Sequence, residues 1–311
     1  MEVVMPRYPQ TILVSCEIPW DEQENLMEDL FRRQVRQTLE DGFNHLYIFG
    51  TAGEGYAVDT SRFRQIVQIF YEETRGENVH PMVGVIGLST ANIVERLEYA
   101  YETGFRVFQI SLPCWEVLND TELMTFFRDV CGSFPAGKFL HYNLTRTKRV
   151  LLGPDYRRLI DEISNLVATK NGGGLARAND LMTHAPELQH FFDEVTFPHG
   201  CLRGECSLLS SFGPMSPHQA RALFEAGRDQ DLERLMRLQQ ECHLMCRNVL
   251  GHLLEEQRVD GAYDKLLVRL GGLDEMPLRL LSPYQGFTEE QYQATKRVLH
   301  EQYPEWVSEG A

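Results

Sequence analysis

The chain has 311 residues, which corresponds to about two average domains or to one α/β barrel. Hydrophobic residues make up 43 % of it and charged residues 24 %, so the chain can build a sizeable core. Thirty Lys and Arg against 45 Asp and Glu leave a formal net charge of −15. With no basic run present, this balance argues against a nucleic-acid partner, and the apolar stretches are too short to predict a membrane span.

The N-terminal segment and the cysteines bear on the cellular compartment. Residues 1–10 lack the basic and then apolar layout of a signal peptide. The seven cysteines are scattered and odd in number, so no disulfide framework is expected. Cys242 and Cys246 would share a helix face, but without a second pair they are interpreted as buried thiols rather than metal ligands. We therefore expect a cytoplasmic protein.

Apolar runs of strand length alternate with amphipathic stretches of helix length. The predicted strands are Thr11–Ile18, His45–Phe49, Met82–Ile86, Val107–Leu112, Lys138–Tyr142, Leu166–Lys170, Leu188–Phe192 and Cys206–Ser211. The predicted helices between them include Glu22–Glu40, Thr60–Thr74, Ala91–Glu102, Thr121–Cys131, Pro154–Ile163 and Leu175–His184. Because such alternation implies parallel strands, the eight units predict an α/β fold, a (β/α)₈ TIM barrel.

The seventh strand could also be placed at Glu194–Pro198. That placement leaves too few residues before the eighth strand for a parallel crossover. Leu188–Phe192 is preferred, because residues 193–205 then provide a short helix with Pro198 near its first turn.

The C-terminal region is too long to supply only the eighth helix of a barrel. Its helical patterns are Pro217–Gly227, Asp231–Glu256, Gly261–Leu270 and Thr288–Tyr303. We therefore expect the barrel in residues 1–228 and a helical extension, packed on the barrel, in residues 229–311.

Chemistry in such barrels lies at the carboxyl ends of the strands, and three predicted strands end in suggestive residues. The second ends in a loop with three glycines, Gly50-Thr-Ala-Gly-Glu-Gly55, which can expose backbone N–H groups to an anion or be an ordinary glycine-rich loop. The sixth ends in Lys170, whose amine becomes a nucleophile toward carbonyls if burial lowers its pKa. Tyr142, one strand away, has a phenol suited to proton transfer. The alternative is a lysine that reaches out to solvent.

These residues, in this order and at strand ends, resemble the dihydrodipicolinate synthase/N-acetylneuraminate lyase family of class I Schiff-base aldolases, over about Ile12 to Tyr303. The stretches that carry the resemblance are Gly50-Thr-Ala-Gly-Glu54, Tyr142-Asn143, Lys170, Glu40-Asp-Gly42, Pro81-Met-Val-Gly84-Val, Gly261-Ala-Tyr-Asp-Lys265 and Pro283-Tyr-Gln-Gly-Phe-Thr-Glu-Glu290.

The resemblance implies a mechanism without a metal or cofactor. Lys170 would form an imine with the ketone of pyruvate or a longer 2-keto acid, and Tyr142 would act as general acid and base. The loop of Thr51, Ala52 and Gly53 would hold the substrate carboxylate, and Asn143 follows the tyrosine. The protonated imine makes carbon–carbon cleavage, its reverse, or dehydration accessible.

Departures from the synthase pattern bear on the substrate. Dihydrodipicolinate synthases usually have two adjacent hydroxyl residues in the glycine loop, and the second is Ala52 here. Their relay tyrosine is replaced by Trp115, and the arginine five residues after the catalytic tyrosine by Thr147. The neighbouring Arg146 and Arg149 are candidate carboxylate contacts or surface arginines. A lysine-pathway synthase is therefore disfavoured.

Sialic acid lyases share one further spacing. Asp193-Glu194 and Ser210 match an acidic pair and a serine that contact sugar hydroxyls in those enzymes, although the same acids could simply begin a helix. Two positions differ, Phe191 and Gly172. Cys206, the first residue of the last predicted strand, completes the candidate substrate contacts.

The preferred reading is a Schiff-base lyase for a small-molecule 2-keto sugar acid. A keto-deoxy sugar acid dehydratase or a condensing enzyme is the alternative, and a non-catalytic binding protein on the same fold is the second alternative. The resemblance also implies a homo-oligomer, tetramer or dimer, with Trp115 where subunits meet. No nucleic acid, membrane or metal is expected as a partner.

Overall fold

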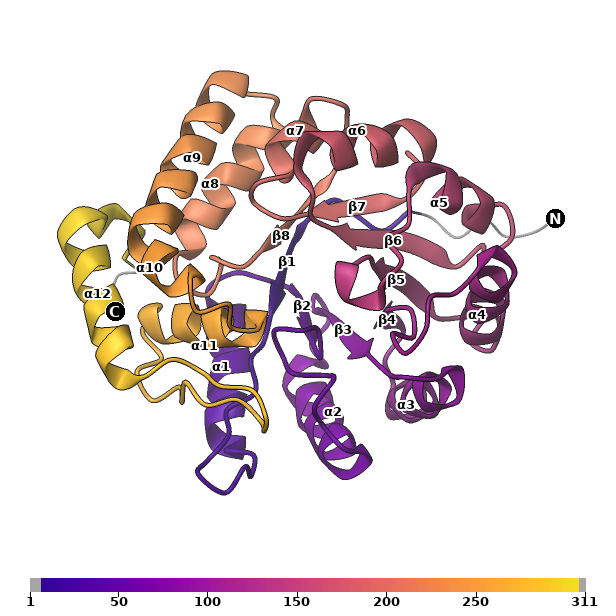
Figure 1. Cartoon of the computed structure of the whole chain (residues 1–311), viewed down its shortest axis with the longest axis horizontal. Helices are drawn as coiled ribbons and strands as arrows, with labels where there is room; N and C mark the ends of the chain where they lie inside the picture. The colour runs from indigo at the N-terminus through magenta and orange to yellow at the C-terminus, as the bar shows by residue number, and fades with distance from the viewer. Residues whose placement is uncertain (1–6, 308–311) are drawn as a thin grey trace.

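The computed structural model describes residues 7–307, and at its centre eight parallel strands close into a barrel in sequence order (Figure 1). The strands are β1 (Ile12–Ser15), β2 (His45–Ile48), β3 (His80–Val85), β4 (Val107–Ile110), β5 (Lys138–Tyr142), β6 (Leu166–Asn171), β7 (Gln189–Phe192) and β8 (Ser207–Ser210). Every predicted strand is present, which confirms the (β/α)₈ barrel. The position of β7 also confirms the choice of Leu188–Phe192 over Glu194–Pro198.

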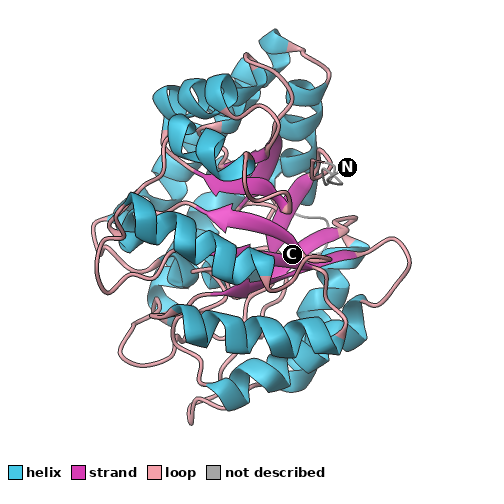
Figure 2. Cartoon of the chain, turned by 90° about the vertical axis from the view of Figure 1, so that its right-hand side faces the viewer, coloured by secondary structure: helices cyan, strands magenta, loops and turns pink. Residues whose placement is uncertain are grey.

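Helices surround the strands on the outside of the barrel (Figure 2). They are α1 (Glu28–Glu40), α2 (Thr60–Thr74), α3 (Thr90–Thr103), α4 (Asp120–Gly132), α5 (Gly153–Ile160), α6 (Gly174–His184), α7 (Phe197–Cys201) and α8 (Pro217–Arg228). The predicted start of α1 at Glu22 is wrong. Asp21 Oδ1 accepts hydrogen bonds from the backbone N–H groups of Gln23 and Asn25, both at 2.8 Å, and this turn delays the helix.

The C-terminal extension is helical, as predicted, but the single helix expected over Asp231–Glu256 is interrupted. It consists of α9 (Leu232–Met245), a π-helical turn (Cys246–Leu250) and α10 (Gly251–Leu254). The extension continues with α11 (Asp260–Leu270), α12 (Glu289–Gln302) and a 3₁₀ turn (Pro304–Trp306). Because π-helical turns are frequent at functional sites, the barrel mouth beside this interruption is a candidate site.

Apolar side chains form separate clusters inside the barrel, outside it and under the C-terminal helices. The inner cluster comprises Tyr8, Leu13, Tyr47, Met82, Leu140, Val167, Ala168 and Phe191. The extension has its own cluster around Leu266, Leu299 and Trp306. Helix α8 ends at Arg228, where the sequence placed the boundary. That residues 229–311 form a separate unit stays a prediction.

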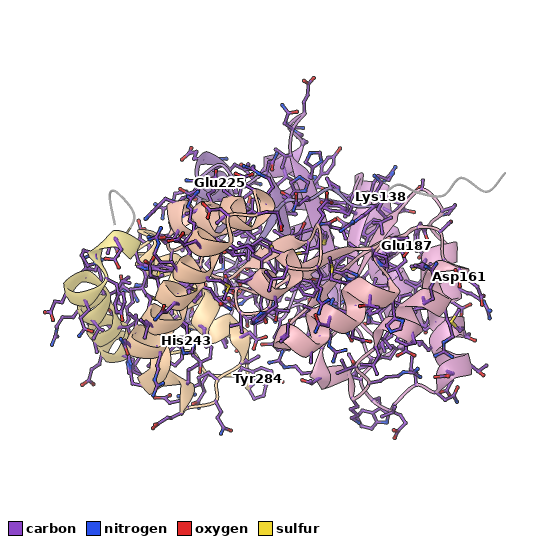
Figure 3. The ribbon with its side chains drawn as sticks, turned by 90° about the horizontal axis from the view of Figure 1, so that it is seen from above. Lys138, Asp161, Glu187, Glu225, His243 and Tyr284 are labelled. Carbon is purple, nitrogen blue, oxygen red and sulfur yellow. The ribbon has the colours of Figure 1, made fainter. Side chains whose placement is uncertain are left out.

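The two ends of the barrel face opposite sides of the molecule. Lys138, the first residue of β5, and Tyr284, in the loop before α12, lie on opposite sides in Figure 3. Tyr284 lines the same cavity as Thr51, which follows β2, so this loop lies at the carboxyl ends of the strands. Within residues 7–307 no helix is long and apolar enough to cross a membrane.

Candidate active site

Lys170 lies near the end of β6 with only 3 % of its surface exposed. Its Nζ donates a 2.8 Å hydrogen bond to the hydroxyl of Tyr47, on β2. The same nitrogen lies 4.2 Å from the ring centre of Tyr47 and 4.1 Å from that of Tyr142. Burial lowers the pKa of Lys170 to about 8, although the carboxyl groups of Asp264 and Asp260 oppose the shift. The amine is therefore held between two aromatic rings and deprotonates far more easily than a surface lysine.

Tyr142, the last residue of β5, pairs directly with Lys170 in the sheet register. Its hydroxyl lies 3.4 Å from Thr51 Oγ1. Burial raises the pKa of Tyr142 to about 12, so the phenol is protonated at neutral pH. A protonated hydroxyl group therefore lies next to Thr51 of the glycine loop, on a ring that contacts the amine of Lys170.

The glycine loop after β2 approaches β3 closely. A Cβ on Gly84 would lie 2.3 Å from the carbonyl oxygen of Phe49, so only glycine fits at this position. Phe49 has a φ of 61°, a left-handed conformation uncommon for a bulky residue. Thr51 and Ala52, which follow, are buried at 3 % and 6 % exposure. The strained backbone at Phe49 thus directs the start of the glycine loop into the barrel mouth.

Glu54 anchors the other end of this loop. Its Oε1 accepts hydrogen bonds from Trp20 Nε1 at 2.8 Å and from Lys265 Nζ at 2.6 Å. Its Oε2 accepts one from the backbone N–H of Leu281 at 2.7 Å. The glycine loop is therefore attached to both the first barrel loop and the C-terminal extension.

Arg146 reaches the site from the 3₁₀ turn after β5. Its guanidinium donates to Thr51 Oγ1 over 3.5 Å and makes two shorter bonds, 2.9 and 2.8 Å, to the carboxylate of Asp260. Arg149, which the sequence made an equal candidate, instead binds Asp120 and the carbonyl of Leu118. Of the two arginines, only Arg146 contacts the glycine loop.

A pocket of about 380 Å³ opens above Lys170. Tyr47, Tyr142 and Lys170 line its inner end, and Ala52 contributes from the glycine loop. Its outer wall comes from the extension, as Cys246, Leu250, Leu254, Asp260, Tyr263, Asp264 and Leu267. The Lys170 amine therefore faces a largely apolar chamber, closed by C-terminal helices, whose wall carries two aspartates.

Asp193, Glu194 and Ser210 lie close together, but the two carboxylates mainly bind backbone N–H groups of the protein. Glu194 Oε1 accepts from Ser210 Oγ at 3.2 Å and from the backbone N–H groups of Ser211 and Phe212 at 2.6 and 3.2 Å. Asp193 Oδ1 accepts from the N–H of Thr196. Asp193 and Glu194 line a cavity of about 500 Å³, which shares Ser211, Phe212 and Cys246 with the lysine pocket.

Of the predicted site residues, Tyr142, Lys170 and Ala52 line the lysine pocket, whereas Thr51 and Arg146 line a neighbouring cavity. Trp115, Cys206 and Asn143 line neither. Trp115 is 79 % exposed in the loop after β4. Cys206 precedes β8, at the opposite end of the strand, with its Sγ 3.6 Å from that of Cys201. Asn143 donates to the carbonyl of Leu151 and to the Asn171 side chain. Its amide therefore holds the loops after β5 and β6 together.

Tyr47, Asp260 and Asp264 also line the pocket and were not predicted from the sequence. A tyrosine inside a strand indicates core packing, so only its inward position, three residues before Gly50, could have identified it. The two aspartates stand four residues apart at the start of a predicted helix, which puts them on one helix face. No sequence signal places that face over the barrel.

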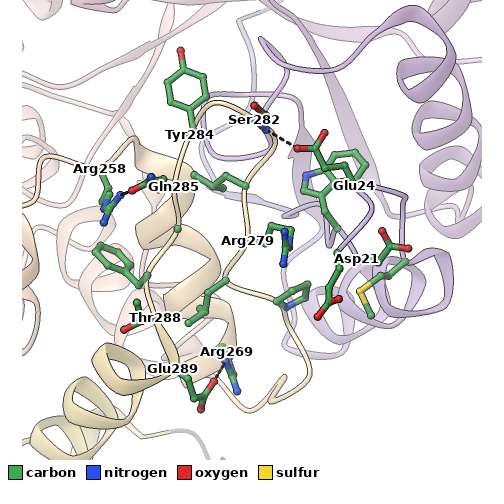
Figure 4. Close-up of a pocket in the computed structure, with 18 of the residues that line it drawn as sticks. Asp21, Glu24, Arg258, Arg269, Arg279, Ser282, Tyr284, Gln285, Thr288 and Glu289 are labelled. Atoms are coloured by element: carbon green, nitrogen blue, oxygen red, sulfur yellow. Dashed lines mark hydrogen bonds and ion pairs between the residues drawn. The ribbon is translucent and has the colours of Figure 1, made fainter.

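A second hollow, of about 880 Å³, lies between the loop before α1 and the loop before α12 (Figure 4). Two of its arginines are engaged, Arg269 with Glu289 at 2.7 Å and Arg258 with Gln285 at 2.6 Å. Its lining includes neither Lys170 nor Tyr142, so it carries no part of the chemistry above. Over residues 7–307, no three His, Cys, Asp or Glu side chains are grouped as a metal site would require.

Comparison with known proteins gives a consistent picture. The model of the dihydrodipicolinate synthetase family matches residues 8–302. N-acetylneuraminate lyase of Salmonella typhimurium is 24 % identical over 243 residues, which covers 77 % of this chain and 81 % of that protein.

Solved structures agree in fold. Dihydrodipicolinate synthase from Aquifex aeolicus matches with a TM-score of 0.83 at 17 % identity, covering 96 % of this chain and 100 % of that one. YagE, a prophage protein of the dihydrodipicolinic acid synthase family from E. coli solved in complex with pyruvate, matches with a TM-score of 0.80 at 17 % identity, covering 94 % and 98 %. The whole architecture, extension included, is thus shared.

Proposed function

Because the chain belongs to the dihydrodipicolinate synthetase family, a family of aldolase-type lyases, we propose that it is a class I lyase whose Lys170 forms a Schiff base with pyruvate or a longer 2-keto acid. One observation carries the proposal: a buried amine, its pKa lowered to about 8, lies against the rings of two tyrosines in a pocket of its own. An imine-forming lysine requires a neutral amine near physiological pH, and this environment supplies it.

The imine forms in two steps. Lys170 Nζ attacks the ketone carbon of the substrate, and the resulting carbinolamine loses water. Tyr142 is the proposed proton donor to the leaving hydroxyl group, because it is protonated at neutral pH and lies over the lysine nitrogen. Thr51 is the proposed hydrogen-bond donor to the substrate carboxylate, together with the backbone of Ala52 and Gly53.

Cleavage then uses the protonated imine as an electron sink. Tyr142, now deprotonated, accepts the proton of the C4 hydroxyl group, the C3–C4 bond breaks, and an aldehyde leaves. The bonding electrons move to C3 and form an enamine on Lys170. Protonation of the enamine at C3 and hydrolysis of the imine release pyruvate and restore the amine.

A 2-keto sugar acid is the preferred substrate class, and cleavage is preferred over dehydration. Asp193 supports this preference, because it lines the cavity adjoining the lysine pocket and a carboxylate can accept hydrogen bonds from sugar hydroxyl groups. Glu194 contributes less, since its carboxylate already holds the backbone after β8. Dehydration of a keto-deoxy sugar acid uses the same imine and remains the second candidate.

The first experiment is intact-mass spectrometry after incubation with pyruvate and sodium borohydride. Wild type gains the mass of one reduced pyruvate adduct, Lys170→Ala gains none, and Lys138→Ala, which removes a lysine at the other end of the barrel, behaves as wild type. Absence of an adduct with pyruvate and with longer keto acids contradicts the proposal. Stabilisation by pyruvate without trapping would favour the non-catalytic binding protein.

A cytoplasmic homo-oligomer is part of the proposal. Trp115 and Val117 expose 79 % and 45 % of their surfaces in one loop of the isolated chain, as is typical of residues covered by a second subunit. Analytical ultracentrifugation of wild type and Trp115→Ala tests this, because loss of the apolar ring lowers the association constant if subunits meet there. Sedimentation of wild type as a monomer contradicts it.

A further inference from the structure

Helix α11 presents one face to the lysine pocket. Asp260, Tyr263, Asp264 and Leu267 line the pocket, and they are spaced as one face of an α-helix requires. Other positions of the helix, Ala262, Leu266 and Leu270, are buried in the cluster of the extension. This packing fixes the rotation of α11, so the two aspartates are held at the outer wall of the pocket, opposite the nucleophile.

The two aspartates differ in what they bind. The carboxylate of Asp260 makes both of its hydrogen bonds to Arg146. Asp264 has no hydrogen-bond or ion-pair partner within the part of the chain that the structure describes, although it is partly buried. Burial, together with the nearby carboxyl groups of Glu17 and Asp260, raises the pKa of Asp264 well above its usual range, so its carboxyl group ionises less readily than that of a surface aspartate. An acceptor held in a substrate pocket without a protein donor is free to bind a donor on the ligand.

The charge of the pocket is unusual for a site that must accept an acid. Lys170 is the sole cationic side chain among the described residues that line it. The nearby Arg146 is neutralised by Asp260, and Lys265 by Glu54. Glu17, fully buried at the end of β1, adds a third carboxyl group close enough to influence both Lys170 and Asp264. One substrate carboxylate can be held at the glycine loop, but a second anionic group would meet acidic groups at the outer wall.

We propose that Asp264 selects the far end of the substrate: it accepts hydrogen bonds from hydroxyl groups there and rejects substrates that carry a second carboxylate or phosphate. This assignment rests on the proposed function, because the near end is fixed by the imine at Lys170. Rejection follows because a second anionic group would be buried beside Asp264 and Glu17 with no free cationic partner, and a buried charge without a partner is costly. The selecting residue therefore belongs to the extension, outside the barrel.

The test compares two keto acids of equal chain length, 2-oxopentanoate and 2-oxoglutarate, which differ in the terminal carboxylate. Trapping by borohydride is measured for each, and their ratio cancels any general change in amine reactivity. Wild type is expected to favour 2-oxopentanoate by about tenfold or more, and Asp264→Asn to reduce that preference by about tenfold. Asp264→Glu, which keeps the carboxyl group, retains the preference. Asp274→Asn, an exposed aspartate outside the pocket, is the matched control.

A polyhydroxylated 2-keto-3-deoxyhexonate provides the second readout. Its half-saturation concentration in the trapping assay should rise about tenfold in Asp264→Asn relative to that of 2-oxopentanoate. If wild type traps pyruvate but Asp264→Asn changes neither ratio, the selection by Asp264 is wrong while the Schiff-base function stands. If wild type traps no keto acid, the proposed function itself fails.

Discussion

Lys265 on α11 donates a 2.6 Å hydrogen bond to Glu54 of the glycine loop, and both side chains are fully inaccessible to solvent. Lys265 also donates to the backbone carbonyl of Arg279 at 2.5 Å. The bond therefore connects the loop that carries Thr51 to the helix that carries Asp260 and Asp264. Through it, the two walls of the pocket are held in one arrangement.

Removing one partner of this pair should be costly. Lys265→Met leaves the Glu54 carboxylate buried without its counter-charge, and we expect a loss of about 3 to 5 kcal/mol in the free energy of unfolding. Urea denaturation measures it. Lys296→Met is the control, since its partner Asp274 is exposed and the change should stay within about 0.5 kcal/mol. Equal effects of the two substitutions would contradict a structural role for the buried pair.

Imine formation should depend on pH through Lys170. Its pKa is lowered from 10.5 to about 8 by burial, and the neutral amine is the reactive form. Below pH 8, the rate of pyruvate trapping should therefore rise about tenfold per pH unit, and it should level off above pH 8. Stopped borohydride reactions between pH 6 and 9.5 measure the profile. A rate that still climbs tenfold per unit at pH 9.5 would mean that the amine behaves as a solvent-exposed lysine.

Tyr47 should influence the pH dependence of pyruvate trapping. Its hydroxyl oxygen accepts a hydrogen bond from Lys170 Nζ, which favours the charged form of the amine. Tyr47→Phe should thus move the midpoint of the trapping profile to lower pH, and lower the plateau by about tenfold because the nitrogen loses its alignment. Tyr8→Phe is the matched control, a buried tyrosine of the same inner cluster that bonds His45 instead. An unchanged midpoint in Tyr47→Phe would show that the hydroxyl does not govern the charge of the amine.

The barrel could be predicted because its signals are local. Each strand is an apolar run, and each predicted helix beside it has a buried face. The two errors, the start of α1 and the unbroken helix over Asp231–Glu256, have different causes. The Asp21 turn had a recognisable signature, an aspartate followed by polar residues. The π-helical turn at Cys246–Leu250 interrupts a continuous amphipathic pattern, so it reflects packing against the barrel mouth rather than a sequence signal.

The site was predictable only where residues end strands. Lys170, Tyr142 and Thr51 follow from strand positions and the family resemblance. Asp264 was not found, because its position at the lysine pocket depends on how α11 packs over the barrel, which brings together residues far apart in the sequence. Whether Trp115 belongs to a site depends on a second subunit, and its position in a single chain does not decide that.

Gly84 and Phe49 provide the last prediction. Gly84→Ala would bring a Cβ to 2.3 Å from the Phe49 carbonyl oxygen and 2.9 Å from that of Ile48. Neither contact involves a flexible side chain, so the backbone before Thr51 must move. We expect a loss of about 1 to 3 kcal/mol in the free energy of unfolding, together with slower pyruvate trapping. Gly132→Ala, at the end of α4 with no atom within 4 Å of the added carbon, should instead gain up to about 1 kcal/mol. Urea denaturation and the trapping assay separate the two, and a Gly84→Ala protein as stable as wild type would contradict the close approach.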